Sequence, residues 1–399
     1  MRLLSVEAAR ARILGAVTPL GVEQVPLTEA RGRFLAGAIR ASRDQPPFAA
    51  SAMDGWAVRA ADGAGPRRII GESAAGHGFS GSVGPGEAVR IFTGAAVPAG
   101  ADVVVLQEDA RREGDRVIIP EAIHARNIRP AGLDFRAGDL LLEVGARLDP
   151  WRLSLAAAAG LAVLPVRTRP RVMILSTGEE VVAPGDAPGA FQIFNSGSTA
   201  LSALAEAWGA VATALPSVGD DEAAIAAAVA GVGGDLIVTL GGASVGDHDL
   251  VKPALARLGL ELKVESVAVR PGKPTSFGLL TDGRGVLGLP GNPASALVCA
   301  ELFLQPLLRA MLGAASPGPR MAMARTHMTL GANGDREHWM RARLAHEPDG
   351  GLWVTPLKDQ DSSLVTIFAQ ADALVRRARQ APAASVGDAV EILLLNRFW

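Results

Sequence analysis

Between residues 169 and 313, short apolar segments alternate with segments that have the spacing of amphipathic helices. This alternation constrains the fold most, because consecutive parallel strands need a crossover connection, which is usually a helix. We therefore predict an α/β domain with a mostly parallel sheet over residues 169–315. Its predicted strands are Val172–Leu175, Val211–Leu215, Leu236–Leu240, Lys263–Val269, Thr275–Leu280 and Val286–Leu289, and its predicted helices cover residues 198–208, 222–229, 251–258 and 293–312.

Three further regions have different patterns. Residues 46–132 contain short apolar strands between glycine and proline turns, which is typical of a small β-rich domain. Residues 1–45 and 133–168 flank that region with helical and extended segments, and we predict that together they form one discontinuous linking domain. A Pro-Gly-Pro break at residues 317–319 is followed by short strands, which predict a C-terminal β-barrel over residues 318–399. The predicted fold class is therefore multi-domain α/β.

The overall charge and the cysteine content exclude several classes of protein. The 39 basic and 41 acidic residues give a net charge of -2, so no whole-molecule field would attract nucleic acid or an anionic membrane. Any anion site must therefore be local. The single cysteine, Cys299, excludes an intramolecular disulfide and a cysteine zinc site, and its apolar surroundings predict a core position. No run reaches the ~20 apolar residues of a membrane span, so we expect a cytoplasmic protein.

The segment from Leu240 to Asp249 is the most informative one, because it follows an apolar strand and opens into a helix. Gly241, Gly242 and Gly246 would let the backbone approach a phosphate. Ser244 can donate its hydroxyl, and the free amides at the start of the helix attract an anion. Asp249 could then bind a cation that the anion carries. Taken alone, a purely structural turn would explain this segment equally well.

Three more loops follow strands of the same unit. Loops at the carboxyl ends of strands converge on one crevice in an open α/β sheet, so we expect them to share a site. Each loop also has a structural explanation, such as a helix start or a solvated acidic turn. Four loops together are harder to explain in that way than one. Their candidate residues are Arg270 and Lys273 in the second loop, Pro290, Asn292 and Ser295 in the third, and Ser176, Thr177 and Glu180 in the fourth.

Polar residues also stand among small or apolar neighbours outside that unit. Asp54 lies in the segment SAMDGWAV, and Thr93 lies in FTGAA. An acid fixed beside a glycine suits a metal or oxyanion site, although a turn-forming aspartate is the usual interpretation. Arg129 and Asp134 stand five residues apart in NIRPAGLD, where a surface salt bridge is the alternative.

Seven ordered segments resemble the family that contains MoeA and the gephyrin E domain. They are SAMDGWAV, FTGAAVPAGAD, NIRPAGLDFRAGD, STGEE, GGASVGDHD, RPGKP and LPGNPASA, and they span almost the whole chain. The resemblance implies a molybdopterin molybdenumtransferase, in which molybdate is inserted into adenylylated molybdopterin with Mg²⁺-dependent release of AMP. It also implies a MogA-like α/β domain and an elongated homodimer whose site is completed by another domain, contributed by the partner subunit. Adenylylated molybdopterin, molybdate and a transient contact with the molybdopterin adenylyltransferase are the implied partners.

The resemblance also assigns roles to individual positions. Glu180 and Asp249 match metal-binding positions, and weaker C-terminal matches fall on Arg341 and Ser362. The implied catalytic residues are Asp54, Thr93, Asp134, Glu180 and Asp249. Taken with the loop residues above, the candidate substrate-binding residues are Arg129, Ser176, Thr177, Gly241, Gly242, Ser244, Gly246, Arg270, Lys273, Pro290, Asn292, Ser295, Arg341 and Ser362.

Two positions depart from the family pattern. Arg270 stands where many members have a lysine, and a guanidinium can bind an oxyanion through two nitrogens. Trp56 stands where tyrosine is frequent, which removes a hydroxyl from that position. The alternatives to the enzyme are a non-catalytic molybdopterin-binding scaffold and a tungsten-directed variant. The motif acids are all present, which favours the enzyme over the scaffold.

Overall fold

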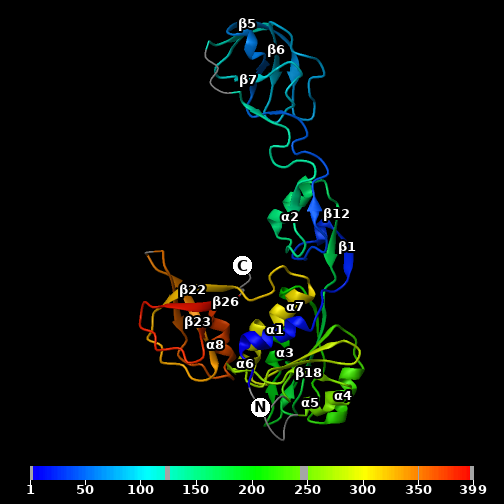
Figure 1. Cartoon of the computed structure of the whole chain (residues 1–399), viewed down its shortest axis with the longest axis vertical. Helices are drawn as coiled ribbons and strands as arrows, with labels where there is room; N and C mark the ends of the chain where they lie inside the picture. Colours follow the sequence, from blue (N-terminus) through cyan, green and yellow to red (C-terminus); the bar gives the residue numbers. More distant parts are fainter. Residues whose placement is uncertain (1–2, 122–125, 243–249, 349, 396–399) are drawn as a thin grey trace.

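The computed structural model describes residues 3–121, 126–242, 250–348 and 350–395. The molecule is elongated, with a β-rich domain at one end and a linking region in the middle (Figure 1). At the other end an α/β domain lies beside a C-terminal β-barrel. This arrangement separates the β-rich domain widely from the α/β domain within one chain.

The α/β domain is built on a sheet of mixed direction. Its strands lie in the order β16, β13, β17, β21, β20 and β18, of which the first four are parallel. Strand β20 is antiparallel to both of its neighbours. The predicted α/β domain with a mostly parallel sheet is therefore confirmed. The bounds are β16 Val211–Ala214, β13 Arg171–Ser176, β17 Leu236–Leu240, β21 Gly285–Leu289, β20 Ser276–Leu279 and β18 Glu261–Val264.

Two separate apolar cores cover the faces of this sheet. One core contains α3, α6 and α7, and the other contains α4 and α5. The predicted last helix is continuous but changes its hydrogen bonding in the middle, where Ala300–Leu304 form a π-helical segment. The helix bounds are α3 Ser196–Ala207, α4 Glu222–Ala230, α5 Val251–Ala256, α6 Pro293–Cys299 and α7 Gln305–Met311.

The first helix, α1 (Val6–Gly15), packs with the α/β domain, although the sequence pattern grouped it with the linking region. Its apolar residues Val6, Ala9 and Ile13 lie in the same core as α3 and α7. Ser5 caps the helix by accepting a hydrogen bond from the amide of Ala8 at 3.1 Å. A short amphipathic helix takes its stability mainly from the core that covers its apolar face, and here the α/β domain provides that core.

The linking region is made by two distant parts of the chain. Strand β1 (Val22–Pro26) pairs antiparallel with β12 (Val163–Arg167), and β2 (Ile39–Arg40) pairs with β11 (Leu140–Leu142). Residues from both parts, including Leu35, Leu148 and Leu164, form one core. The region also contains the 3-10 turn Leu27–Glu29 and α2 (Pro150–Ala158).

The β-rich domain contains a six-stranded sheet in the order β7, β4, β6, β5, β9 and β8. Small apolar cores on both faces hold it together. The pair β3 and β10 lies where the chain enters and leaves the domain. The bounds are β3 Ala50–Ser51, β4 Gly55–Val58, a 3-10 turn Ala60–Asp62, β5 Gly65–Ser73, β6 Glu87–Ile91, β7 Val103–Leu106, β8 Arg111–Glu113, β9 Arg116–Ile119 and β10 Ile128–Arg129.

The C-terminal domain is a closed five-stranded barrel, as the sequence predicts. Its strands follow the order β23, β24, β22, β26 and β25, and β25 pairs back to β23. The short strand β19 (Val269–Arg270) of the α/β domain joins it by pairing parallel with β23. The bounds are β22 Met321–Thr326, β23 Glu337–His346, β24 Leu352–Pro356, α8 Val365–Gln370, β25 Ala373–Arg377 and β26 Ala389–Leu394.

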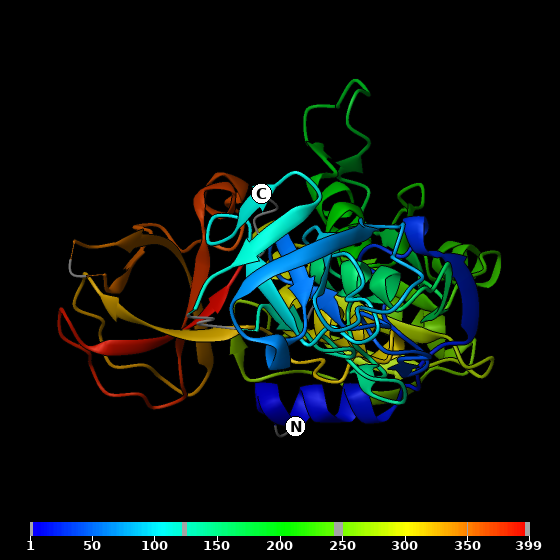
Figure 2. The same ribbon diagram turned by 90° about the horizontal axis from the view of Figure 1, so that it is seen from above.

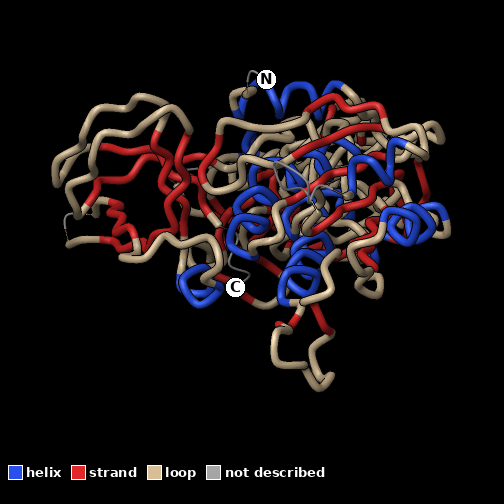
Figure 3. Tube along the Cα trace, turned by 90° about the horizontal axis from the view of Figure 1, so that it is seen from below, coloured by secondary structure: helices blue, strands red, loops and turns tan. Residues whose placement is uncertain are grey.

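Two further features concern the surface and the longest helix. Strands β14 (Val181–Val182) and β15 (Ile193–Phe194) pair at the base of a loop that projects from the α/β domain (Figures 2 and 3). One helical segment among the described residues, Pro293–Met311, has the length and apolar character of a membrane span. Within its apolar 18-residue stretch, 89% is buried inside the protein, as expected for a core helix.

Candidate functional site

The carboxyl ends of three neighbouring parallel strands open into one cavity of about 760 Å³, which we call the strand-end cavity. Residues that follow β13, β17 and β21 line it, together with the start of α3 and residues of the C-terminal domain. Strand direction explains this convergence, because parallel strands present their following loops at one edge of the sheet. The candidate residues in its lining are Ser176, Thr177, Glu180, Gly241, Gly242, Pro290 and Asn292.

A hydroxyl network forms one wall of the strand-end cavity. The hydroxyls of Ser176 and Ser198 are 2.7 Å apart. The side-chain amide of Asn195 donates to Ser176 Oγ and Ser198 Oγ at 3.0 Å each, and its Oδ1 caps α3 by accepting from the amide of Ser198. Ser217 Oγ accepts from the same Asn195 amide at 3.4 Å. Ser176 is therefore held in place from the next helix, which the sequence did not indicate.

Gly241 and Gly242 both have positive φ angles, of +86° and +58°. A Cβ atom at Gly241 would lie 2.8 Å from the carbonyl oxygen of Thr177, and one at Gly242 would lie 2.4 Å from a methyl of Val251. Glycine is thus required both for the backbone conformation and for the close approach of neighbouring atoms. The turn can bring its backbone to the edge of the cavity for this reason.

Two carboxylates, Glu180 and Asp220, line the strand-end cavity among the described residues. No cluster of three or more His, Cys, Asp or Glu side chains suited to a metal occurs in the described ranges. Mg²⁺ does not need such a cluster, because it usually takes one or two carboxylates and fills its remaining positions with phosphate oxygens and water. The donor set here fits Mg²⁺ that is bound together with a phosphate-bearing ligand.

A second cavity of about 410 Å³ lies between the α/β domain and the barrel, and we call it the basic cavity. Three cationic side chains line it: Arg270 at the end of β19, Lys273 in the loop that follows, and Arg336, which directly precedes β23. Ser295 at the start of α6 and the segment Gln360–Ser362 complete its lining. Such a concentration of positive charge suits an anion.

One carboxylate of the basic cavity is turned toward its own loop. Asp361 Oδ1 accepts hydrogen bonds from the amide and the hydroxyl of Ser363 at 2.8 and 2.7 Å. These hydrogen bonds, with the more distant charge of Arg341, hold the pKa of Asp361 below its ordinary value. Asp361 therefore stays ionised, but its charge is engaged by its own loop.

Arg341 supports the basic cavity from behind and does not line it. Its side chain is completely buried, and its Nη2 donates to the backbone carbonyl of Asp361 at 2.8 Å. The backbone amide of Arg341 donates to the Gln360 side-chain carbonyl at 2.9 Å, and the Gln360 amide donates back to the Arg341 carbonyl. Desolvation lowers the pKa of Arg341 from its ordinary value. Arg341 thus fixes the segment that carries Ser362.

His338 lines the basic cavity and pairs with Arg270 in the register of β19 and β23. Arg270 Nη2 and His338 Nδ1 are 3.1 Å apart. Desolvation first, and then the charges of Arg270, Arg341, Arg336 and Arg377, lower the pKa of His338 to about 4. The ring is therefore neutral over the physiological range.

The two cavities adjoin one another. Pro274 lines both of them, and Asn292 of the strand-end cavity donates from Nδ2 to Ser362 Oγ of the basic cavity at 2.9 Å. The amide of Ala294 also donates to the carbonyl of Ser362 at 3.0 Å. The start of α6 is thus tied to the barrel, and a ligand that filled both cavities would contact both domains.

The loop of the basic cavity rests on Cys299. This thiol is fully buried in the core of α6, as the sequence predicts, and its Sγ lies 3.1 Å from Thr275 Oγ1. Desolvation raises the pKa of the Cys299 thiol to about 12. Gly272 has a φ angle of +116°, and a Cβ atom there would lie 2.1 Å from Cys299 Sγ. The thiol is a packing group beneath the loop.

Asp54 and Thr93 meet in the β-rich domain. The amide and the hydroxyl of Thr93 both donate to Asp54 Oδ1 at 2.7 Å. These two hydrogen bonds are the main reason that the pKa of Asp54 is lowered from its ordinary value. Asp54 is partly exposed to solvent and therefore presents a persistent carboxylate at the surface of this domain.

Arg90 stands beside that acidic turn and was not indicated by the sequence. Its guanidinium lies 5.3 Å from the ring centroid of Trp56 and 4.7 Å from that of Phe92. It also donates to the carbonyl of Gly55 at 3.0 Å and to Gln107 Oε1 at 2.6 Å. The aromatic ring of Trp56 therefore serves as a platform for a cation, a role that does not need a tyrosine hydroxyl.

Arg129 and Asp134 lie along the connection between the β-rich domain and the linking region. Arg129 is exposed in β10, opposite Ala50 of β3, and the amide of Asp134 donates to the carbonyl of Gln45 at 2.9 Å. Strand β3 also contacts the Thr93 segment, because the amide of Ser51 donates to the carbonyl of Ala95 at 2.9 Å. The Asp54, Thr93 and Arg129 segments thus gather at the same end of the domain.

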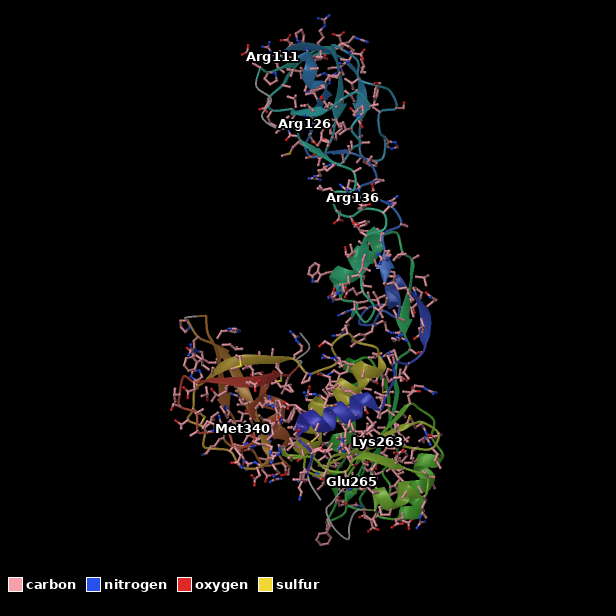
Figure 4. All side chains as sticks on the ribbon, in the orientation of Figure 1. Arg111, Arg126, Arg136, Lys263, Glu265 and Met340 are labelled. Atoms are coloured by element: carbon pink, nitrogen blue, oxygen red, sulfur yellow. The ribbon has the colours of Figure 1, made fainter. Side chains whose placement is uncertain are left out.

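The candidate residues therefore fall into two groups that do not meet within one chain. Asp54, Thr93, Arg129 and Asp134 belong to the first group. In Figure 4, Arg111 and Arg126 mark the domain of that group, and Lys263 marks the distant α/β domain. The candidates Ser244, Gly246 and Asp249 lie outside the described residues. The cavity residues Asp220, Asn195, Arg336, His338 and Gln360 were missed, because they carry no motif and come together only in the folded chain.

Comparison with known proteins matches nearly the whole chain. Residues 4–160 match the model of the MoeA N-terminal region (domain I and II), residues 173–310 a probable molybdopterin binding domain, and residues 324–395 the MoeA C-terminal region (domain IV). A molybdopterin molybdenumtransferase from Haemophilus influenzae is 32% identical over 402 residues, which cover 99% of each chain. One from Nostoc is 36% identical over 82% of this chain and 78% of its own.

A solved structure agrees with these matches. The molybdopterin biosynthesis MoeA protein from Pyrococcus horikosii superposes with a TM-score of 0.85 at 30% identity, and the match covers 100% of both chains. The likeness therefore extends to all the domains and to their arrangement, beyond the α/β unit alone.

Proposed function

The chain belongs to the MoeA family of molybdopterin molybdenumtransferases, and from that premise we propose that it inserts molybdate into adenylylated molybdopterin with release of AMP. Transfer of molybdenum in cofactor biosynthesis is the activity of the family. The assignment of substrate, metal and residues is our proposal. The observation that carries it is the pair of adjoining cavities, one lined by hydroxyls and glycine turns and the other by three cations.

Each cavity suits a different part of the reaction. The strand-end cavity would bind adenylylated molybdopterin, with its phosphates against the Gly241–Gly242 turn and the hydroxyl network at Ser176. The basic cavity would bind molybdate, which is a tetrahedral dianion that Arg270, Lys273 and Arg336 would neutralise. Ser295 and Ser362 would donate hydroxyl hydrogen bonds there. The two dithiolene sulfurs would displace an oxo ligand of molybdate, which leaves as water with the two thiol protons. A water oxygen would attack the phosphoanhydride bond, so that molybdopterin keeps one phosphate and AMP leaves.

Glu180 is the described residue that we assign to Mg²⁺, and Asp220 faces the same cavity. When bound, Mg²⁺ would neutralise the phosphate charge that develops as AMP departs. Asp249 remains a proposed ligand from outside the described residues. The role of the protein would be to hold the phosphate and the cation together at the edge of the sheet.

We further propose a homodimer, because the two groups of candidate residues lie far apart in one chain (Figures 1 and 4). In a twofold assembly, the β-rich domain of one subunit would bring Asp54, Thr93, Arg129 and Asp134 to the cavities of the other. Cytoplasmic location and a transient contact with the molybdopterin adenylyltransferase complete the proposal. Such a contact would pass on the adenylylated substrate.

The direct test supplies the purified protein with adenylylated molybdopterin and Mg²⁺ and measures AMP. We expect release to require molybdate, because insertion and cleavage are coupled. The matched control replaces molybdate with an equal ionic strength of chloride. Tight binding of the pterin without AMP release in either case would instead identify a scaffold.

Mixed dimers test the shared site. The variants D54N and K273A should each be inactive, because each removes one half of every site. When the two are unfolded together and refolded as a mixture, about a quarter of the wild-type activity should return, since random pairing restores one intact site in each mixed dimer. A mixture that stays as inactive as its components would place both residues in sites within one chain.

A further inference from the structure

We propose that the neutral imidazole of His338 positions Arg270 through Nδ1 and donates a hydrogen bond from Nε2 to a tetrahedral oxyanion in the basic cavity. The proposal rests on the proposed function, because it concerns the anion of the same site. His338 has no counterpart among the candidate residues of the sequence. It is brought to the cavity by the pairing of β19 with β23.

The hydrogen bond between the two side chains fixes the tautomer of the ring. Arg270 Nη2 lies 3.1 Å from His338 Nδ1, and a guanidinium can only donate. Nδ1 must therefore be the acceptor, which leaves the single proton of the neutral ring on Nε2. Within the described part of the chain, no residue is hydrogen bonded to Nε2, and protein atoms do not seal it off. The Nε2–H group is thus available to the cavity.

The surroundings of His338 keep this arrangement neutral. The groups that act on it are Arg270 from β19, Arg336 and Arg341 from the β23 segment, and Arg377 from β25. Lys273 and Asp361 also line the same cavity. Because the ring is buried among cations, its pKa is lowered to about 4, and a second proton would displace Arg270 from Nδ1. A neutral ring can accept a hydrogen bond from Arg270 and leave the positive charge of the guanidinium available to the anion.

The position of His338 also links the two domains of the cavity. Arg270 belongs to the α/β domain and His338 to the barrel, and their backbones are neighbours in the sheet. An arginine side chain has many rotamers, and the acceptor at His338 Nδ1 favours the one seen here, in which Arg270 lines the cavity. The ring therefore acts on the anion twice, once through Arg270 and once directly.

Two substitutions separate these two roles. In H338N the side-chain oxygen can occupy the place of Nδ1 and hold Arg270, and in H338Q the side-chain amide can occupy the place of Nε2 and donate to the anion. We expect each variant to bind molybdate alone about 2- to 10-fold more weakly, and H338F to lose both effects, about 10- to 100-fold. H327Q is the matched control and should bind as the wild type does, because His327 lies beside Trp353 and Glu347 and lines neither cavity.

A thermodynamic cycle excludes a purely structural role. H338Q removes the Nδ1 acceptor that holds Arg270. In an R270K background the lysine ammonium cannot use that acceptor in the same geometry, so H338Q should weaken molybdate binding less there than in the wild type. The wild type and H338Q should also show parallel changes of molybdate affinity between about pH 5 and 8, because His338 does not titrate there. Additive effects in the cycle, or a histidine-dependent inflection near neutral pH, would overturn the proposal.

The anion itself is identified by running the same titrations with inorganic phosphate. If the variants bind molybdate more weakly but phosphate as the wild type does, His338 contacts molybdate. If they bind phosphate more weakly but molybdate as the wild type does, His338 contacts a phosphate of the substrate. Unchanged affinity for both anions in H338N, H338Q and H338F would refute the role of His338. AMP release at saturating molybdate is measured separately, so that failure of the proposed function in the wild type is distinguished from failure at His338.

Discussion

At the scale of single residues, the carboxylate of Asp54 allows a direct test of the proposed reaction. It accepts two hydrogen bonds, both from Thr93. Because the hydrogen bonds of Thr93 lower its pKa, Asp54 is ionised throughout the range in which the protein works. We predict that D54N, which keeps the shape and removes the charge, lowers the rate of AMP release by about 100-fold or more. The unfolding midpoint should change little, because the side chain is only partly buried and the asparagine oxygen can still accept from Thr93.

Thr93 supplies the control for that prediction. T93S keeps the hydroxyl donor and should retain most activity, whereas T93V loses the hydroxyl but keeps the backbone donor. We expect T93V to lie between the wild type and D54N in AMP release. Equal activity of D54N and the wild type would remove Asp54 from the reaction.

Gly272 and Cys299 form a second pair at the residue scale. We predict that G272A destabilises the protein by about 1–3 kcal/mol, because it combines a positive φ angle with a close contact to the thiol. It should also raise the molybdate concentration for half-maximal AMP release, since the loop carries Arg270 and Lys273. Denaturant unfolding and steady-state kinetics measure the two effects.

The double variant G272A/C299A separates the causes of that loss. Removing the thiol relieves the contact but leaves the backbone strain, so part of the stability should return. C299A alone should affect stability more than rate. Iodoacetamide should label Cys299 only after unfolding, because the thiol is buried and its pKa is raised to about 12. Rapid labelling of the native protein would contradict the packing role.

At the scale of elements, the π-helical segment contains a buried carboxyl group, which is unusual in an apolar core. Glu301 lies within it, almost fully buried, with Gln305 Nε2 at 3.4 Å from its Oε2. Desolvation raises the pKa of Glu301 to about 8, and the charge of Arg309 opposes this only in part. The folded state therefore holds a proton on Glu301 near neutral pH that the unfolded state releases.

This difference predicts how stability depends on pH. The contribution of Glu301 is fully present below the unfolded pKa near 4.5 and is lost as pH rises through the folded pKa of about 8. E301Q mimics the protonated form, so it should be more stable than the wild type at high pH, by on the order of 4 kcal/mol near pH 8. Chemical denaturation at acidic and alkaline pH measures the gap. Curves that keep a constant separation would contradict the assignment.

The arrangement of the strands also explains why residues of the strand-end cavity could be predicted from the sequence. Ser176, Leu240 and Leu289 end three neighbouring parallel strands, and each is followed by a glycine or proline turn. Periodicity predicted the strands, and parallel direction then required their following loops to meet. No such rule brings together the loops that follow the antiparallel strands β20 and β18. The long strand predicted at residues 263–269 is in fact divided between the ends of β18 and β19.

At the scale of the whole molecule, the domains differ in how they are held together. Trp339, Leu374 and Leu393 of the barrel lie in the same core as α1, α3 and α7. Figure 4 labels the neighbouring Met340 on the barrel beside the α/β domain. The described residues of the β-rich domain form two small cores that include no residue of the other domains. We therefore expect the barrel and the α/β domain to unfold together and the β-rich domain to unfold separately.

Calorimetry of two variants tests this division. W339A should lower the stability of the shared unit by about 3–5 kcal/mol and leave the β-rich domain unchanged. I119A, in the core of the β-rich domain, should do the reverse, with a loss of about 2–5 kcal/mol. A single transition that both variants shift equally would show that the domains are coupled.

The sequence by itself determined the local structure and the kinds of chemistry. Hydrophobic periodicity set the strands and helices, glycine and proline set the turns, and both depend on a few neighbouring residues. Residues within such local motifs, for example Lys273 and Asn292, could therefore be predicted as site residues from the sequence. Only the tertiary structure decided which of them meet, because Arg270 and His338 become neighbours through a strand pair that crosses between two domains. It also placed Asp54 far from the cavities and moved α1 into the α/β core, because long-range packing depends on the shape of the whole chain.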